Sequence, residues 1–94
     1  MYVSNPEEEY HQTVSKPLKV IASFSDKGKI RPIYIEYDGF TVKVEEILRQ
    51  RTMNDWGVKA LEFVLSYTVG DMRREVKIRY ALETHIWYLP VHNL

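Results

Sequence analysis

From Pro17 to the end of the chain, apolar and polar residues alternate with a period of two, and β-branched and aromatic residues are frequent. This pattern is typical of half-buried β-strands, because successive side chains of a strand point to opposite faces of its sheet. All four glycines, Gly28, Gly39, Gly57 and Gly70, fall between the alternating runs, where turns use positive φ angles. Since no long stretch with a helical period competes, the sequence predicts an all-β domain.

Three turns predict the register of the strands that they join. Asp38-Gly39 is typical of a type I′ turn, Gly70-Asp71 fits a type II′ turn, and Glu83-Thr84 continues the inner row into a last strand. The second turn also sets Glu62 opposite Arg79 on the outer face. The predicted inner pairs are all apolar: Tyr37–Phe40, Ile35–Val42, Ile33–Val44, Leu65–Val76, Phe63–Ile78, Leu61–Tyr80, Tyr80–Trp87, Ile78–Leu89 and Val76–Val91.

Six antiparallel strands in a meander are predicted, at residues 18–25, 30–37, 40–50, 60–69, 73–82 and 86–91. No amphipathic helix covers their apolar face, so we expect closure, complete or nearly so, into an SH3-like or similar barrel or roll. Alternation fails at residues 45–48, which indicates a bulge or a short helical turn. The first hairpin, around residues 26–29, fits a loop of three or of four residues.

Residues 1–16 form an acidic leader with no sustained period, and residues 17–94 form the predicted domain. The leader is interpreted as a mobile segment that folding does not require. The alternative is docking, because four apolar or aromatic residues flank the acidic run Glu7–Glu9. The four are Tyr2, Val3, Tyr10 and Val14, and the basic residues that the acidic run would meet on another subunit are Arg73, Arg74, Lys77 or Arg79.

Composition narrows the possible functions. The chain has no cysteine, which excludes disulfides, thiol nucleophiles and cysteine-ligated zinc. Its 13 basic and 13 acidic residues give no net charge that would attract nucleic acid or anionic lipid. No apolar run approaches the roughly 20 residues of a spanning helix, and no signal peptide is recognisable, so a cytoplasmic protein is expected. His11, His85 and His92 lack metal-ligand spacing, and no nucleophile elbow or phosphate loop occurs, so we expect no enzyme, metal or cofactor.

The segment from Lys29 to Val44, with Arg31-Pro32-Ile33-Tyr34-Ile35-Glu36-Tyr37-Asp38-Gly39-Phe40, resembles a small family of bacterial β-domains of unknown function. The likeness continues through Glu75-Val76-Lys77-Ile78-Arg79-Tyr80 and a closing Trp87-Tyr88 pair. It spans about three-quarters of the chain, rests on hydrophobic positions and one turn, and implies the β fold alone, with no functional residue.

The predicted outer rows set basic residues beside aromatic rings. Tyr34 lies opposite Lys43, Arg79 opposite Tyr88 and Lys77 opposite Pro90. Cations beside exposed rings are typical of single-strand nucleic-acid binding, although mixed charge on a solvent face equally serves solubility. Trp56, in the expected loop from Thr52 to Lys59, is interpreted with Met53 as a plug for the end of the barrel, or as an anchor for a partner.

The candidate binding surface therefore comprises Tyr34, Lys43, Trp56, Lys77, Arg79 and Tyr88. The sequence favours a non-catalytic binding module that associates with proteins, either with itself as a homo-oligomer or with another chain through an edge strand. The alternative function is nucleic-acid binding through the basic and aromatic outer face.

Overall fold

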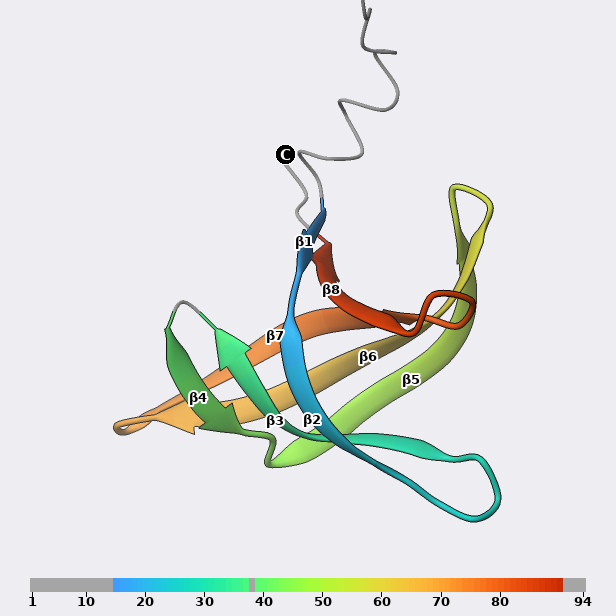
Figure 1. The fold of residues 1–94 in the computed structure, drawn as a ribbon. Coiled ribbons are helices and arrows are strands. Elements are labelled where there is room, and N and C mark those ends of the chain that lie inside the picture. Colours follow the sequence, from blue (N-terminus) through green and yellow to red (C-terminus); the bar gives the residue numbers. More distant parts are fainter. Residues whose placement is uncertain (1–14, 38, 91–94) are drawn as a thin grey trace, which may run out of the picture.

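The computed structural model describes residues 15–37 and 39–90, and every regular element among them is a β-strand (Figure 1). The all-β prediction is confirmed, with eight strands in place of the six expected. They are β1 (Ser15–Pro17), β2 (Lys19–Phe24), β3 (Ile30–Tyr37), β4 (Phe40–Lys43), β5 (Glu46–Asp55), β6 (Val58–Val69), β7 (Met72–Ala81) and β8 (Ile86–Pro90). Most of the predicted leader, Asp38 and the predicted partner Val91 lie outside the described residues.

The strands form two antiparallel sheets, so the expected barrel is wrong. A five-stranded large sheet has the order β1-β8-β7-β6-β5, and a three-stranded small sheet has the order β2-β3-β4. The small sheet lies across one face of the large sheet (Figure 1). No ladder within the described residues joins β2 or β4 to a strand of the large sheet, and a closed barrel needs an unbroken ring of ladders.

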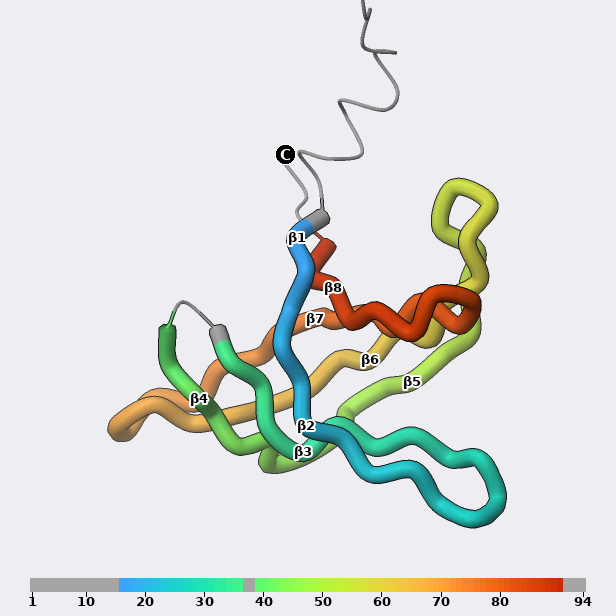
Figure 2. Tube along the Cα trace, in the orientation of Figure 1, coloured from blue at the N-terminus to red at the C-terminus, as the bar shows by residue number. Residues whose placement is uncertain are grey.

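The reason is that the predicted strand 40–50 breaks in two. Val44 and Glu45 separate β4 from β5, and the chain bends sharply there from one sheet into the other (Figure 2). The Glu45 N–H donates to the Ser66 carbonyl at 2.8 Å, which ties the bend to β6. A register shift between Ile47 and Arg49 follows, and it is the bulge that the broken alternation predicts. The bend starts a second sheet instead of curving one sheet closed.

The N-terminal strand also passes from one sheet to the other. β1 pairs with β8, with Ser15 opposite Pro90 and Lys16 opposite Leu89. Leu18 then links β1 to β2, and its N–H donates to the Trp87 carbonyl at 2.9 Å. The large sheet therefore includes two residues that the sequence assigns to the leader.

The predicted hairpin registers are largely confirmed. Ile35 lies opposite Val42, Phe63 opposite Ile78 and Glu62 opposite Arg79. The last hairpin also has the predicted register, with Tyr80 opposite Trp87, but the pairs described between β7 and β8 end at Arg79 and Tyr88. Beyond that point β8 pairs with β1, so the predicted pairs of Leu89 with Ile78 and of Pro90 with Lys77 are not among those described.

The first hairpin has the three-residue loop, one of the two lengths that the sequence leaves open. The Ser25 N–H donates to the Lys29 carbonyl at 2.8 Å, and the Gly28 N–H donates to the Ser25 carbonyl at 3.0 Å. Gly28 has a φ of 80°. Positive φ at the last loop residue is typical of a three-residue hairpin loop with a glycine bulge.

The core lies between the two sheets. Phe63, Leu65 and Ile78 are fully buried in the large sheet, and Ile35 is the buried residue that the small sheet adds to this cluster. Val76 and Leu89 pack against the cluster, so the five core residues Phe63, Leu65, Val76, Ile78 and Leu89 do share one core, as their registers predict. The opposite face of the large sheet is left open for polar residues.

Candidate functional site

The six residues of the predicted binding surface lie in three places. Tyr34 and Lys43 are cross-strand neighbours on the outer face of the small sheet. Lys77, Arg79 and Tyr88 lie on the outer face of the large sheet, where Arg79 is opposite Tyr88. Trp56 occupies the turn between β5 and β6. Each predicted basic and aromatic pair is therefore present, but the six residues do not form one surface.

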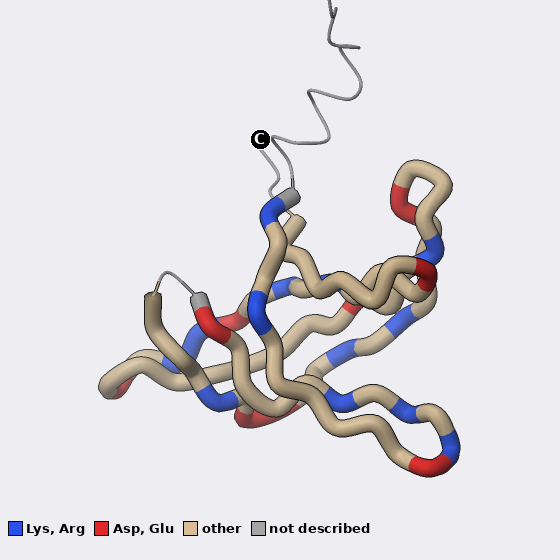
Figure 3. The backbone as a smooth tube through the Cα atoms, viewed as in Figure 1, with Lys and Arg blue, Asp and Glu red and all other residues tan. Residues whose placement is uncertain are grey.

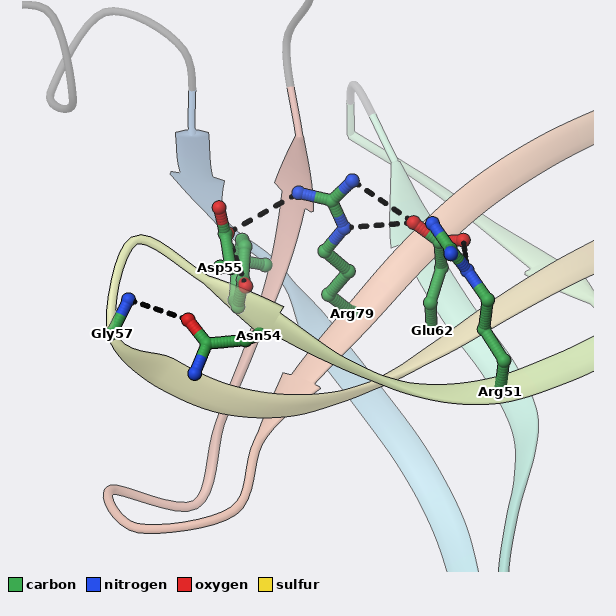
Figure 4. Close-up of polar contacts among 7 residues, drawn as sticks. Arg51, Asn54, Asp55, Gly57, Glu62 and Arg79 are labelled. Atoms are coloured by element: carbon green, nitrogen blue, oxygen red, sulfur yellow. Dashed lines mark hydrogen bonds and ion pairs between the residues drawn. The ribbon is translucent and has the colours of Figure 1, made fainter.

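Trp56 does not plug a barrel. Its side chain is 61% exposed, and its segment is a tight hairpin instead of the expected loop from residue 52 to residue 59. Trp56 and Gly57 have φ angles of 55° and 88°, which are typical of a type I′ turn. The Asn54 Oδ1 accepts the Gly57 N–H at 2.7 Å, which stabilises the turn (Figure 4). Trp56 therefore lies in the turn of the β5–β6 hairpin, which extends away from the large sheet (Figure 1).

A buried ionic network crosses the outer face of the large sheet. The Glu62 side chain, 5% exposed, accepts from Arg51 Nε at 2.7 Å and from Arg79 Nε at 3.0 Å (Figure 4). Arg79 Nη1 lies 3.2 Å from Asp55 Oδ2, and the Tyr88 hydroxyl donates to the same oxygen at 2.6 Å. These contacts connect β5, β6, β7 and β8, so the network fastens four strands and reaches Asp55, next to the β5–β6 turn.

Sequence reasoning predicts the pair of Glu62 and Arg79 but misses Arg51 and Asp55. Both missed residues follow the bulge in β5, where the sequence predicts the end of a strand and then a loop. A two-residue turn at Trp56-Gly57 would have set Arg51 opposite Glu62, as observed. The signal is weak because a non-glycine residue seldom adopts a positive φ, so tryptophan does not suggest a turn.

Burial and neighbouring charges shift the pKa of Glu62 and of Tyr88 in this network. Burial raises the pKa of Glu62, but the hydrogen bonds from Arg51 and Arg79 outweigh burial and leave the pKa below its ordinary value. Burial and the neighbouring Asp55 carboxylate raise the pKa of the Tyr88 hydroxyl. Glu62 is therefore charged and Tyr88 is a neutral donor near neutral pH. Because Arg79 is 8% exposed and occupied by two acids, it has little capacity to contact a nucleic-acid backbone.

An apolar groove lies at the opposite end of the molecule from the tip of the β5–β6 hairpin, between β4 and the β6–β7 hairpin (Figure 2). Its volume is about 510 Å³. Phe40 and Val69 in its lining are 71% and 55% exposed, and Met72, next to it on the hairpin, is 58% exposed. Lys43 and Arg74 are its charged lining residues.

The edge of β4 adds unpaired backbone to this groove. β4 pairs with β3 alone, and the Phe40–Tyr37 and Val42–Ile35 pairs use the backbone groups on that side. The backbone groups of Thr41 and Lys43 therefore point away from β3, and both residues line the groove. The groove combines exposed apolar side chains with a strand edge that no ladder covers within the described part of the chain.

Among the described residues, Glu45, Glu46 and His85, which could act in catalysis or bind a metal ion, have separate partners. Glu45 accepts from the Thr68 hydroxyl at 2.9 Å and Glu46 binds Arg73 at 3.3 Å, so these carboxylates do not meet Glu62. His85 Nδ1 lies 2.9 Å from the Tyr80 hydroxyl, whereas His11 and His92 lie outside the described residues. Within residues 15–37 and 39–90, no group of three or more histidine or acidic side chains is positioned to hold a metal ion.

Comparison of the chain with protein-family models, with curated proteins and with solved structures finds no match. The resemblance to a bacterial β-domain family therefore stays a prediction. The described residues form no helix that is long and apolar enough to cross a membrane.

Proposed function

We propose that the protein is a non-catalytic association module that binds an extended protein segment along β4. The observation that carries this proposal is the unpaired edge of Thr41 and Lys43 beside the apolar groove. An exposed edge offers backbone donors and acceptors to an added strand, and neighbouring pockets select its side chains. Among the other edge strands, β5 carries Arg49, Arg51 and a bulge, which are features that discourage strand addition.

The groove favours an occupant with apolar and acidic residues. Phe40 and Val69 offer apolar contact, while Lys43 and Arg74 give the lining a positive charge with no acid among the lining residues. The chain's own segment 1–14 combines Glu7–Glu9 with four apolar or aromatic residues, Tyr2, Val3, Tyr10 and Val14. This complementarity supports homotypic association, in which the N-terminal segment of one copy occupies the β4 groove of another.

The test compares the full chain with a chain that begins at Ser15, which keeps β1 intact. Light scattering should give a mass above that of the monomer for the full chain and the monomer mass for the shorter chain. A synthetic peptide of residues 1–14 should bind the shorter chain, and a scrambled peptide should not. Binding should be lost in Lys43→Glu/Arg74→Glu and kept in Lys27→Glu/Arg31→Glu, which makes the same charge change on the first hairpin.

Thr41→Pro separates strand addition from contact by side chains alone. It removes an N–H that points away from β3, so the β3–β4 ladder is kept while the added strand loses a donor. A monomeric full chain with no affinity for the peptide overturns the proposal. So does a sharp fall in melting temperature of the shorter chain without a change of mass, because that result means docking within one molecule.

A further inference from the structure

A second, independent site lies on the outer face of the large sheet. A hollow of about 500 Å³ is lined there by Arg49, Gln50, Arg51, Glu62, Val64 and Lys77, and we call it the basic hollow. We propose that the basic hollow binds the phosphate group of a small phosphorylated molecule. The basic hollow shares no lining residue with the β4 groove, so this proposal does not depend on strand addition.

Strand register sets the cations on either side of the hollow. Arg49 on β5 and Lys77 on β7 both lie opposite Val64 of β6, the strand between them. Neighbouring strands are about 4.8 Å apart, so the two backbones are about 10 Å apart across a short apolar side chain. Arg51 is the next outer-face residue on β5. Long basic side chains from both flanks can therefore converge on one anion above Val64.

Glu62 is the one acid among the lining residues, and it attracts Lys77 without forming an ion pair with it. Glu62 uses Oε1 for Arg51 and Oε2 for Arg79, so both of its oxygens are already bound. Arg51 contributes only its Nε to that contact, which leaves its two terminal nitrogens to other partners. Within the described part of the chain, neither Arg49 nor Lys77 has a side-chain hydrogen bond or ion pair.

The acidic residues next to the hollow are not among its lining residues. In the next row of the outer face, Glu46 is bound by Arg73, and Glu75 lies on β7 outside the lining. Figure 3 shows that basic and acidic residues are otherwise interspersed along the chain, so the hollow is a local feature and not part of a basic face. A concave site with one sign of charge attracts counter-ions more strongly than a flat surface does.

The chemistry of the lining favours phosphate on a small molecule. Guanidinium groups donate in pairs to phosphate oxygens, and lysine supplies a further charge-assisted hydrogen bond. A hollow of about 500 Å³ has the size of a small-molecule pocket and exceeds what a bare ion needs. None of its lining residues is aromatic, so it lacks the rings on which the bases of a single strand would stack.

The test uses inorganic phosphate, pyrophosphate and ribose 5-phosphate, titrated at low salt and followed by amide shifts in NMR spectra. Saturable shifts should map to β5, β6 and β7. Arg49→Gln/Lys77→Gln should weaken binding by about tenfold or more, because both flanking cations that would donate to the phosphate are removed. Lys27→Gln/Arg31→Gln, with the same change of net charge on an exposed hairpin, should change the Kd by less than about twofold.

Absence of a saturable shift with all three probes overturns the proposal, and so does equal weakening by the two double variants, which indicates nonspecific attraction. If an oligothymidylate binds more tightly than every small probe and shifts the same residues, the proposal that the ligand is a small molecule is overturned. If Lys77→Gln lowers the melting temperature, Arg49→Gln alone provides the comparison, because the exposed Arg49 side chain makes no hydrogen bond or ion pair with the described residues.

Discussion

The two sheets differ in how many fully buried side chains they contribute to the core. The large sheet holds most of the fully buried side chains, among them Phe63, Leu65 and Ile78. The small sheet buries Pro32 and Ile35 but leaves Ile21 60% exposed and Phe40 71% exposed. Because apolar burial is the main favourable contribution to folding, the large sheet should determine stability. The small sheet covers one of its faces and presents apolar residues to partners.

The ion pairs of the two sheets also differ in burial. On the large sheet, Glu62 and Arg79 are buried and paired. On the small sheet, the ion pair of Lys19 with Glu36 spans 3.8 Å between largely exposed side chains. Exposed pairs contribute little to stability, whereas a charge left alone in a buried network is costly. The comparison therefore predicts strong effects of substitutions on one sheet and weak effects on the other.

The largest loss is expected for Arg79→Met. It leaves Glu62 with one arginine and Asp55 without a cation, in a region where Arg79 is 8% exposed. Breaking a buried pair by removing one partner costs about 3–5 kcal/mol, which urea unfolding measures. Arg51→Met is the matched control, and its loss should be clearly smaller because that side chain is 63% exposed. Equal losses for the two variants would contradict the division between buried and exposed charge.

The next largest loss is expected for Ile78→Ala. Ile78 is 0% exposed in the large sheet, and truncation of such a residue costs about 2–5 kcal/mol through lost burial and the cavity that remains. Ile21→Ala on the small sheet removes the same atoms from a side chain that is 60% exposed, so its loss should stay below about 0.5 kcal/mol. A loss below that limit for Ile78→Ala would rule out the core between the sheets.

These two predictions differ in how far the sequence alone supports them. Alternation and turn residues are local signals, so they predict Ile78 opposite Phe63 and Glu62 opposite Arg79 correctly. The break at Val44 and Glu45 depends on which sheet buries the following residues, and alternation is the same in either case. For that reason the pairs are predictable from the sequence, while the two-sheet arrangement and most of the ionic network are not.

Tyr88→Phe tests the link between the network and β8. The Tyr88 hydroxyl donates to Asp55 at 2.6 Å, and a hydrogen bond to a charged group contributes about 1.5–3 kcal/mol. The variant should lose stability within that range. Burial and Asp55 also raise the pKa of Tyr88, so a spectrophotometric titration should find a tyrosine that ionises above the ordinary tyrosine pKa, and this group should be absent in the variant.

The stability of the large sheet should also depend on pH through Glu62. Its folded pKa lies below the ordinary value of 4.5, so the unfolded state binds more protons as the pH falls. The stabilisation is present above pH 4.5 and is lost as the pH falls through the lowered folded pKa, with a slope of at most about 1.4 kcal/mol per pH unit. Urea unfolding between pH 7 and pH 3 should show a shallower slope for Glu62→Gln, and an unchanged slope would contradict this contribution.

The smallest effect is expected for Ser66→Ala, and its sign is favourable. Ser66 is 0% exposed on β6 of the large sheet, and its hydroxyl is the one buried side-chain polar group without a hydrogen-bond partner in the described part of the chain. A buried polar group without a partner is destabilising, so its removal should change stability by between zero and about 1 kcal/mol in favour of the fold.

Thr68→Val, two residues further along β6, is the matched control for that experiment. Its hydroxyl donates to Glu45 Oε1 at 2.9 Å near the bend between the sheets, so its removal should be mildly destabilising. If Ser66→Ala stabilises the protein and Thr68→Val destabilises it, the buried hydroxyl of β6 differs in its effect from the hydroxyl at the junction with β4. A loss above about 1 kcal/mol for Ser66→Ala would mean that its hydroxyl binds an ordered water, and that the interior of the large sheet contains a polar contact.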